Sequence, residues 1–408
     1  MRISTVTMFE QSTASMNRQQ SDLMKVSQQI ASGRRVVNPS DDPQAASRAV
    51  GVDQAKAVTE QYSDSRVSAR NSLSQTESIL NSISDAITSA KTLLVQASSD
   101  TLTDANRESI ASELKGVYET MLGQANATDG SGRYLFGGYK DSEPPFAKDG
   151  NENVQYKGDS NTREQRVDAS RLMSVADNGE TIFKSVASGA GYVAEADNAN
   201  TGNVTFRGPQ INDVKDATDF RITFTSDSEF SIETYDNDSN SWTPGPTGQT
   251  YSGGDSPQQI AVGGISITLE GTPAAGDEIL VAKSGGDVRG ADLFRTMEEA
   301  IRVLENPADN ATKKADQRNT LNTAMRDLDN SLDNVLTVRA SAGARLNELD
   351  VIDSVGSNRM LNYDQTLSDL VDLDYAEAIS EYSLRQIGMQ AAQKAFVDIK
   401  GLSLFNYM

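Results

Sequence analysis

The chain has 408 residues and a net charge of −21 at pH 7. This length holds two or three domains, and so acidic a chain repels nucleic acid and anionic membranes, which argues against both as partners. There is no cysteine and no histidine, which excludes disulfides, Ser-His-Asp catalysis and every metal site that needs those ligands. We therefore expect a protein that is not an enzyme and that holds no metal or cofactor.

No segment of the sequence has the length and hydrophobicity of a membrane span, which needs about 18 or more apolar residues. The opening residues MRISTVTMFEQST also lack the apolar region of a Sec-type signal peptide. We expect a protein that stays in the cytoplasm or leaves it by a route that reads no such signal.

A thin apolar stripe predicts a first helix from about residue 9. Its residues recur every seven positions, with one more between them, on a surface of uncharged polar side chains. They are Phe9, Met16, Leu23, Val26 and Ile30. We interpret the stripe as a coiled-coil surface for partners of the same kind, with an ordinary amphipathic helix as the alternative.

The stretch GRRVVNPSDDP predicts a hinge between two helices. Gly33 can end the first helix in a left-handed cap, and Asn38 is pushed out of the helical region by Pro39. Asp42 and Pro43 form a natural N-cap and first-turn pair. A metal or catalytic role for the pair Asp41 and Asp42 is the alternative. Capping already explains Asp42, and exposure to solvent explains Asp41.

Apolar residues at alternating three- and four-residue spacing predict a second helix from about 43 to 98, interrupted only by Arg66. At 1.5 Å per residue it would be roughly 80 Å long, and such a rod needs other helices to cover its stripe. A turn at DTLTD precedes a third helical pattern over 110–125.

Between about 141 and 286 the pattern changes to period two, which predicts a β-rich insert with two lobes split near 190–203. Ile222 and Phe224 precede an SDSE turn that leads to Phe230 and Ile232. The segment DNDSNSW starts like a calcium loop but lacks the glycine and glutamate that such a loop needs, so we predict a hairpin turn there.

Helical spacing resumes over 293–304, breaks at Asn306-Pro307 and continues over 321–349. These segments supply partners for the helix at 43–98. We predict a second interruption near SNRMLNYDQT, followed by a last helix. Its apolar residues include Leu373, Leu384, Ile387, Ala391 and Leu402.

The predicted fold is mainly α with a β-rich insert (α+β), in which both termini contribute to a long coiled-coil bundle. We expect a terminal assembly domain of residues 1–42 and 366–408, a long helical bundle of 43–140 and 287–365, and an outer domain of 141–286. The terminal stripes are too thin to hold helices alone, so we expect both ends to be mobile in a monomer.

Several stretches carry a resemblance to a known family. These are the start MRISTVTMF, ASGRRVVNPSDDPQAASRAV, SGRYLFGGYKDSEPPF, VRASAGARLNELD and the ending DLVDLDYAEAISEYSLRQIGMQAAQKAFVDIKGLSLFNYM. The chain resembles the hook-associated protein type three family of the flagellin-like superfamily, the distal proteins of the bacterial hook-filament junction. Both termini match, whereas the insert matches loosely.

The resemblance implies a non-enzymatic ring of subunits between the proximal junction protein and the flagellin filament, outside the cell. It implies export through the flagellar type III apparatus and a cytoplasmic chaperone on the last helix. The implied assembly interface consists of Phe9, Met16, Leu23, Val26, Ile30, Leu373, Leu384, Ile387, Ala391, Leu402 and Phe405.

Other functions remain open. Flagellin shares the design of the end helices, although the NPSDDP stretch and the aromatic ending favour the junction protein. The proximal junction protein is disfavoured because no Asn-Leu-Ala-Asn-like segment follows the first helix. A flagellin-like peptidase would need HExxH and is excluded in that form. A secreted coiled-coil adhesin or effector is the alternative from another class.

Overall fold

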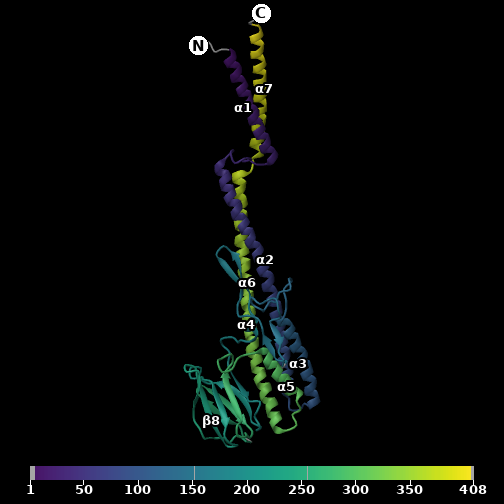
Figure 1. Ribbon diagram of the computed structural model, residues 1–408, viewed down its shortest axis with the longest axis vertical. Helices are drawn as coiled ribbons and strands as arrows, with labels where there is room; N and C mark the ends of the chain where they lie inside the picture. Colours follow the sequence, from purple (N-terminus) through teal and green to yellow (C-terminus); the bar gives the residue numbers. More distant parts are fainter. Residues whose placement is uncertain (1–4, 151, 255, 406–408) are drawn as a thin grey trace. The chain divides into compact units, whose positions relative to one another are not determined.

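The computed structural model describes residues 5–150, 152–254 and 256–405, which form two compact units (Figure 1). Unit 1 comprises residues 1–64 and 351–408, and unit 2 comprises residues 65–350. The boundary falls inside the two longest helices, α2 (Pro43–Ala97) and α6 (Ala311–Val371). The sequence pattern alone suggests boundaries near the ends of these helices, at 42 and 366.

In unit 1, the helices α1 (Thr5–Ser32) and α7 (Tyr375–Phe405) lie side by side and run in opposite directions (Figure 1). Near their far ends, the rings of Phe9 and Phe396 have centroids 5.1 Å apart. Near the connector, the backbone N of Leu373 donates to the Gly33 carbonyl at 3.0 Å. The first and last helices of the chain are therefore each other's nearest partners.

The connector between α1 and α2, residues 33–42, follows the predicted cap chemistry. Gly33 has a φ of +70°, the left-handed region that glycine adopts without strain. Asp42 accepts a hydrogen bond from the backbone N of Ala45 at 3.0 Å, and α2 begins at Pro43. Asp41 accepts from the N of Asn38 at 2.9 Å. The helix ends are thus set locally, while hinge motion stays a prediction.

The predicted interruption near SNRMLNYDQT is wrong, because α6 runs without a break to Val371. That stretch contains no glycine or proline, so nothing in its backbone opposes a helix. The chain leaves the helix only at residues 372–374. There Asp374 accepts hydrogen bonds from the N of Ala376 at 2.9 Å and of Glu377 at 3.2 Å, which caps α7.

Unit 2 contains a helical bundle of α2, α3 (Asp104–Ala125), α5 (Leu293–Glu305) and α6. Its core also takes side chains from the hairpin β1 (Phe146–Lys148) and β2 (Val154–Tyr156) and from the short helix α4 (Gly179–Phe183). Four phenyl rings meet there, and the pairs in contact have centroids 5.0 to 5.8 Å apart: Phe136–Phe183, Phe146–Phe183, Phe146–Phe294 and Phe183–Phe294. The first lobe of the predicted insert is thus packed into the bundle core.

A second hairpin, β3 (Arg163–Asp168) and β4 (Arg171–Ala176), explains the irregular position in the α2 stripe. Arg66 is 3% exposed and donates to the carbonyl of Val167 in β3 at 3.1 Å. A polar residue in an apolar stripe therefore marks the place where a strand carbonyl needs a donor.

The second lobe is a sandwich of a six-stranded and a three-stranded sheet whose apolar faces share one core. Phe224 pairs with Phe230 and Ile222 with Ile232, as the alternation predicts, and a turn joins β8 to β9 at the DNDSNSW segment. The strands are β5 (Tyr192–Ala196), β6 (Thr205–Ile211), β7 (Phe220–Phe224), β8 (Glu229–Asp236), β9 (Ser241–Pro244), β10 (Gln249–Thr250), β11 (Gln258–Val262), β12 (Ile265–Glu270) and β13 (Glu278–Lys283). The lobe starts with β5 at Tyr192, within the range of 190–203 that was expected for the split.

A polar row on α6 holds the open edges of both sheets. Thr323 donates to the carbonyl of Ala194 in β5 at 2.7 Å. Asn319 accepts from the N of Phe206 in β6 at 3.1 Å and donates to the carbonyl of Val204 at 2.8 Å. Edge strands left uncovered expose unpaired backbone groups, and here helix side chains satisfy them.

Candidate assembly surface

Apolar surface is distributed very unevenly between the two units. Unit 1 holds 122 of the 408 residues but 13 of the 20 exposed large hydrophobic side chains found among the described residues. These are Phe9, Met24, Val37, Val50, Val58, Val351, Val355, Leu361, Tyr375, Ile379, Leu384, Ile387 and Val397. Both hydrophobic cores lie in unit 2. Exposed apolar surface on this scale indicates an interaction site in unit 1.

The predicted stripe of α1 is covered in part by α7. Val26 is buried, while Met16, Leu23 and Ile30 are half-buried. Phe9 remains 46% exposed although its ring contacts Phe396. One partner helix therefore leaves a substantial part of this stripe open to solvent.

The residues of α7 that lie toward α1 were missed by the sequence reasoning. Phe396 contacts Phe9, and Tyr382 and Met389 precede it at seven-residue spacing on the same helix face. All three are half-buried. The repeat of large side chains every seventh residue is the signal that could have identified this face.

The predicted residues of α7 lie on a different face. Leu384 is 67% and Ile387 63% exposed, and Ala391 is exposed as well. Leu373 is half-buried beside the connector. The side chains of Leu402 and Phe405 lie outside the described residues. The structure therefore separates an α7 face that packs on α1 from an outward face that its own chain leaves uncovered.

Polar contacts and one close approach complete the α1–α7 pair. Arg385 donates to Asp22 at 2.8 Å and to Glu381 at 3.1 Å. A Cβ at Gly388 would lie only 2.9 Å from the Oε1 of Gln19, so glycine lets the helices approach here. Exposed ion pairs contribute about 0–1 kcal/mol each, so these contacts fix the register of the pair more than they stabilise it.

A groove of about 430 Å³ lies beside the connector, between it and the helices α2 and α6 of unit 1. Its apolar lining includes Val36, Val37, Pro39, Ala46, Ala49, Val50, Leu367 and Val371, and the charged residues around it are Arg34, Asp53, Asp364 and Asp372. Among the four charged residues, Asp364 pairs with Lys56 at 2.6 Å. The groove adds a concave apolar feature to the exposed surface of unit 1.

Hydrogen bonds stabilise the ionised form of both aspartates in the connector. The N–H of Ala45 and then the Arg35 guanidinium hold the pKa of Asp42 below its ordinary value. The N–H of Asn38 and the Lys25 ammonium lower the pKa of Asp41 in the same way. These carboxylates are occupied in shaping the connector, which agrees with a capping role.

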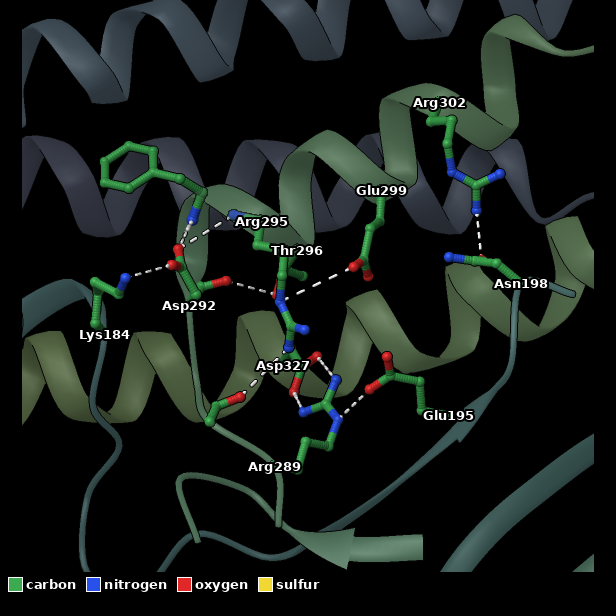
Figure 2. Close-up of polar contacts among 12 residues, drawn as sticks. Lys184, Glu195, Asn198, Arg289, Asp292, Arg295, Thr296, Glu299, Arg302 and Asp327 are labelled. Atoms are coloured by element: carbon green, nitrogen blue, oxygen red, sulfur yellow. Dashed lines mark hydrogen bonds and ion pairs between the residues drawn. The ribbon is translucent and has the colours of Figure 1, made fainter. Parts of the chain in front are cut away.

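A buried charge cluster around Arg289 lies in unit 2 and has a structural role (Figure 2). Arg289, 4% exposed, pairs with Glu195 of β5 and donates to both carboxylate oxygens of Asp327 in α6, at 2.8 and 2.6 Å. Burial raises the pKa of nearby Glu299. All three guanidinium nitrogens of Arg289 bond to carboxylates, so the cluster ties the second lobe to α6.

Over the described ranges, no group of three or more acidic side chains is placed to hold a metal ion. The helices described here include none that is long and apolar enough to cross a membrane.

Comparisons with known proteins agree with this arrangement. Residues 3–141 match the bacterial flagellin N-terminal helical region. Flagellar hook-associated protein 3 of Escherichia coli K12 is 34% identical over 99% of both chains, and that of Salmonella typhimurium LT2 is 32% identical over the same share.

Solved structures are similar too. The crystal structure of Xanthomonas campestris FlgL is 27% identical, with a TM-score of 0.65 over 78% of this chain and 99% of that one. The hook-associated protein 3 structure from Legionella pneumophila, at 22% identity and a TM-score of 0.66 over 78% and 98%, shares the fold. With relatives at 34% and 32% identity along nearly its whole length, this chain belongs to the flagellar hook-associated protein 3 family.

Proposed function

We propose that this chain is a structural subunit of the hook-filament junction and that it assembles through unit 1. One observation carries the proposal: unit 1 leaves most of the exposed apolar side chains uncovered, whereas unit 2 contains its own cores. Apolar surface that a single chain leaves open is completed by neighbouring subunits in an assembly. Membership of the hook-associated protein 3 family supports the place of that assembly in the flagellum.

The proposed partners are copies of this chain in a ring, the proximal junction protein on one side and flagellin on the other. The outward face of α7, with Leu384, Ile387 and Ala391, would be covered by an export chaperone before assembly and by other subunits afterwards. A chain without cysteine suits passage through the type III apparatus in an unfolded state, because no disulfide can form on the way.

No catalytic activity is part of this proposal. The buried Arg289 cluster is closed by its own ion pairs. Histidine, the commonest acid-base group, and cysteine, a strong nucleophile, are absent from the sequence.

The test is localisation on sheared flagella with an antibody against this chain. We expect a single band at the hook end of the filament and, after deletion of the gene, flagellin released into the medium. Complementation with the intact gene is the control and should restore attached filaments. Continuous labelling would instead indicate a filament subunit, and normal motility of the deletion strain without any label on flagella would refute the junction role and favour a secreted adhesin or effector.

A further inference from the structure

Three charged side chains of the groove beside the connector make no ion pair with the described chain. Arg34, Asp53 and Asp372 are exposed, and no ion pair joins their side chains to any described residue. Between them lies the apolar lining, in which Val50 is 67% exposed. An apolar groove edged by unpaired charges suits a helix that brings both apolar side chains and the opposite charges.

The outward face of α7 has these properties. Four residues at i, i+4, i+7 and i+11 lie in one row along the helix. They are Ile387, Ala391, Lys394 and Asp398. All four are exposed, and neither Lys394 nor Asp398 has an ion pair with a described residue. The row therefore offers two small-to-medium apolar side chains followed by one charge of each sign.

A chain cannot place this row in its own groove. The groove includes Val371 and Asp372, and α7 begins at Tyr375, directly after them. From Tyr375 the helix runs along α1 away from the connector, because Phe396 meets Phe9 and Arg385 meets Asp22. Ile387 is twelve residues into α7, which places it about 18 Å along the helix from its start. The occupant must come from another molecule.

We propose that this groove is the docking site for the outward face of α7 of a second copy of the chain. Ile387 and Ala391 enter the apolar lining, Lys394 lies near Asp53 and Asp372, and Asp398 lies near Arg34. The proposal rests on the assembly role proposed above and specifies which surfaces of two subunits meet. It makes the contact heterologous, since the groove and the helix face are different surfaces, and such contacts build rings or tubes.

The absence of cysteine allows a direct test. Cells produce two variants together, Val50→Cys and Ala391→Cys, and their isolated flagella are treated with a short bismaleimide. Because each chain carries one cysteine, a link between the two variants joins different molecules. We expect at least about tenfold more dimer than with either variant alone, since docking raises the local concentration of one thiol near the other. Val67→Cys, an exposed α2 valine in unit 2, replaces Val50→Cys in the matched control.

A charge exchange separates docking from loss of folding. Lys394→Glu should lower the yield of the Val50–Ala391 link, and Asp53→Lys combined with Asp372→Lys in the groove-bearing chain should restore it. Lys115→Glu, at an exposed lysine of unit 2, is the matched control and should leave the yield unchanged. Absence of restoration would overturn the charge pairing.

The two proposals can fail separately. If both variants are present at the hook end but link no better than the Val67→Cys control, the docking contact is wrong and the junction role stands. If neither variant is found on flagella although both are produced, the junction role falls and the docking contact falls with it.

Discussion

The two units use similar helices in opposite ways. In unit 2, α2 and α6 are enclosed by α3, α5 and the first strands of the insert. The apolar residues of their stripes are therefore buried in a hydrophobic core. In unit 1, α1 and α7 have mainly each other, and their other faces keep large apolar side chains in water. We therefore expect stripe width and the number of partners, rather than helix propensity, to decide how stable each of these helices is within one chain.

The largest expected difference between the units is in amide exchange of the purified chain. Residues of α2 from 80 to 97 should open only on unfolding of unit 2, whereas α1 and α7 should open locally. If unit 2 unfolds globally with a free energy of about 5–15 kcal/mol, the amide protection factors in α2 should exceed those in α1 and α7 by at least about 10³-fold. Equal protection in α1, α7 and α2 would contradict the comparison and the expected mobility of both ends.

Truncating a core ring should weaken unit 2 far more than truncating an exposed side chain weakens unit 1. Phe294 is 1% exposed and contacts three other aromatic rings. Phe294→Ala should lower the free energy of unfolding by about 3–5 kcal/mol, measured by urea denaturation. Ile387→Ala is the control and should change it by less than about 0.5 kcal/mol. A large effect of Ile387→Ala in the monomer would mean that its own chain covers this face.

The polar row of α6 should contribute less to the unfolding free energy of unit 2 than the aromatic core does. Asn319→Ala leaves the N of Phe206 and the carbonyl of Val204 without partners, and we expect a loss of about 1–3 kcal/mol in the unfolding free energy of unit 2. Faster exchange of the Phe206 amide should accompany it. Asn347→Ala, at an exposed asparagine on the same helix, should have almost no effect. If both variants behave alike, the edge of β6 does not depend on α6.

The smallest effect concerns the connector of unit 1 in acid. Because the pKa of Asp42 is lowered in the folded state, its contribution is complete above the ordinary value of 3.8 and is lost as the pH falls through the lower folded pKa. In an NMR titration, the amide shift of Ala45 should therefore change with a midpoint below pH 3.8. Asp42→Asn should remove this transition. A midpoint at or above 3.8 in the original chain would show that the cap is not formed.

Much of the fold could be predicted because it depends on local patterns. Backbone preferences within a few residues set the start of α2 at Pro43 and the left-handed conformation of Gly33. Side-chain periodicity over a similar distance predicts the pairing of Phe224 with Phe230. The resemblance to the family could also be seen in the sequence, because it is carried by short continuous stretches at both termini, at 131–146 and at 338–350.

Other features depended on residues far apart in the sequence. The sequence marked Arg66 only as an irregular position, and its role became visible once β3 placed a carbonyl beside it. The same holds for Asn319 and Thr323, whose partners lie more than a hundred residues away. Periodicity shows that α7 has apolar faces, but only its antiparallel contact with α1 decided that Phe396 is covered and Ile387 is open, because burial is set by which helix stands opposite.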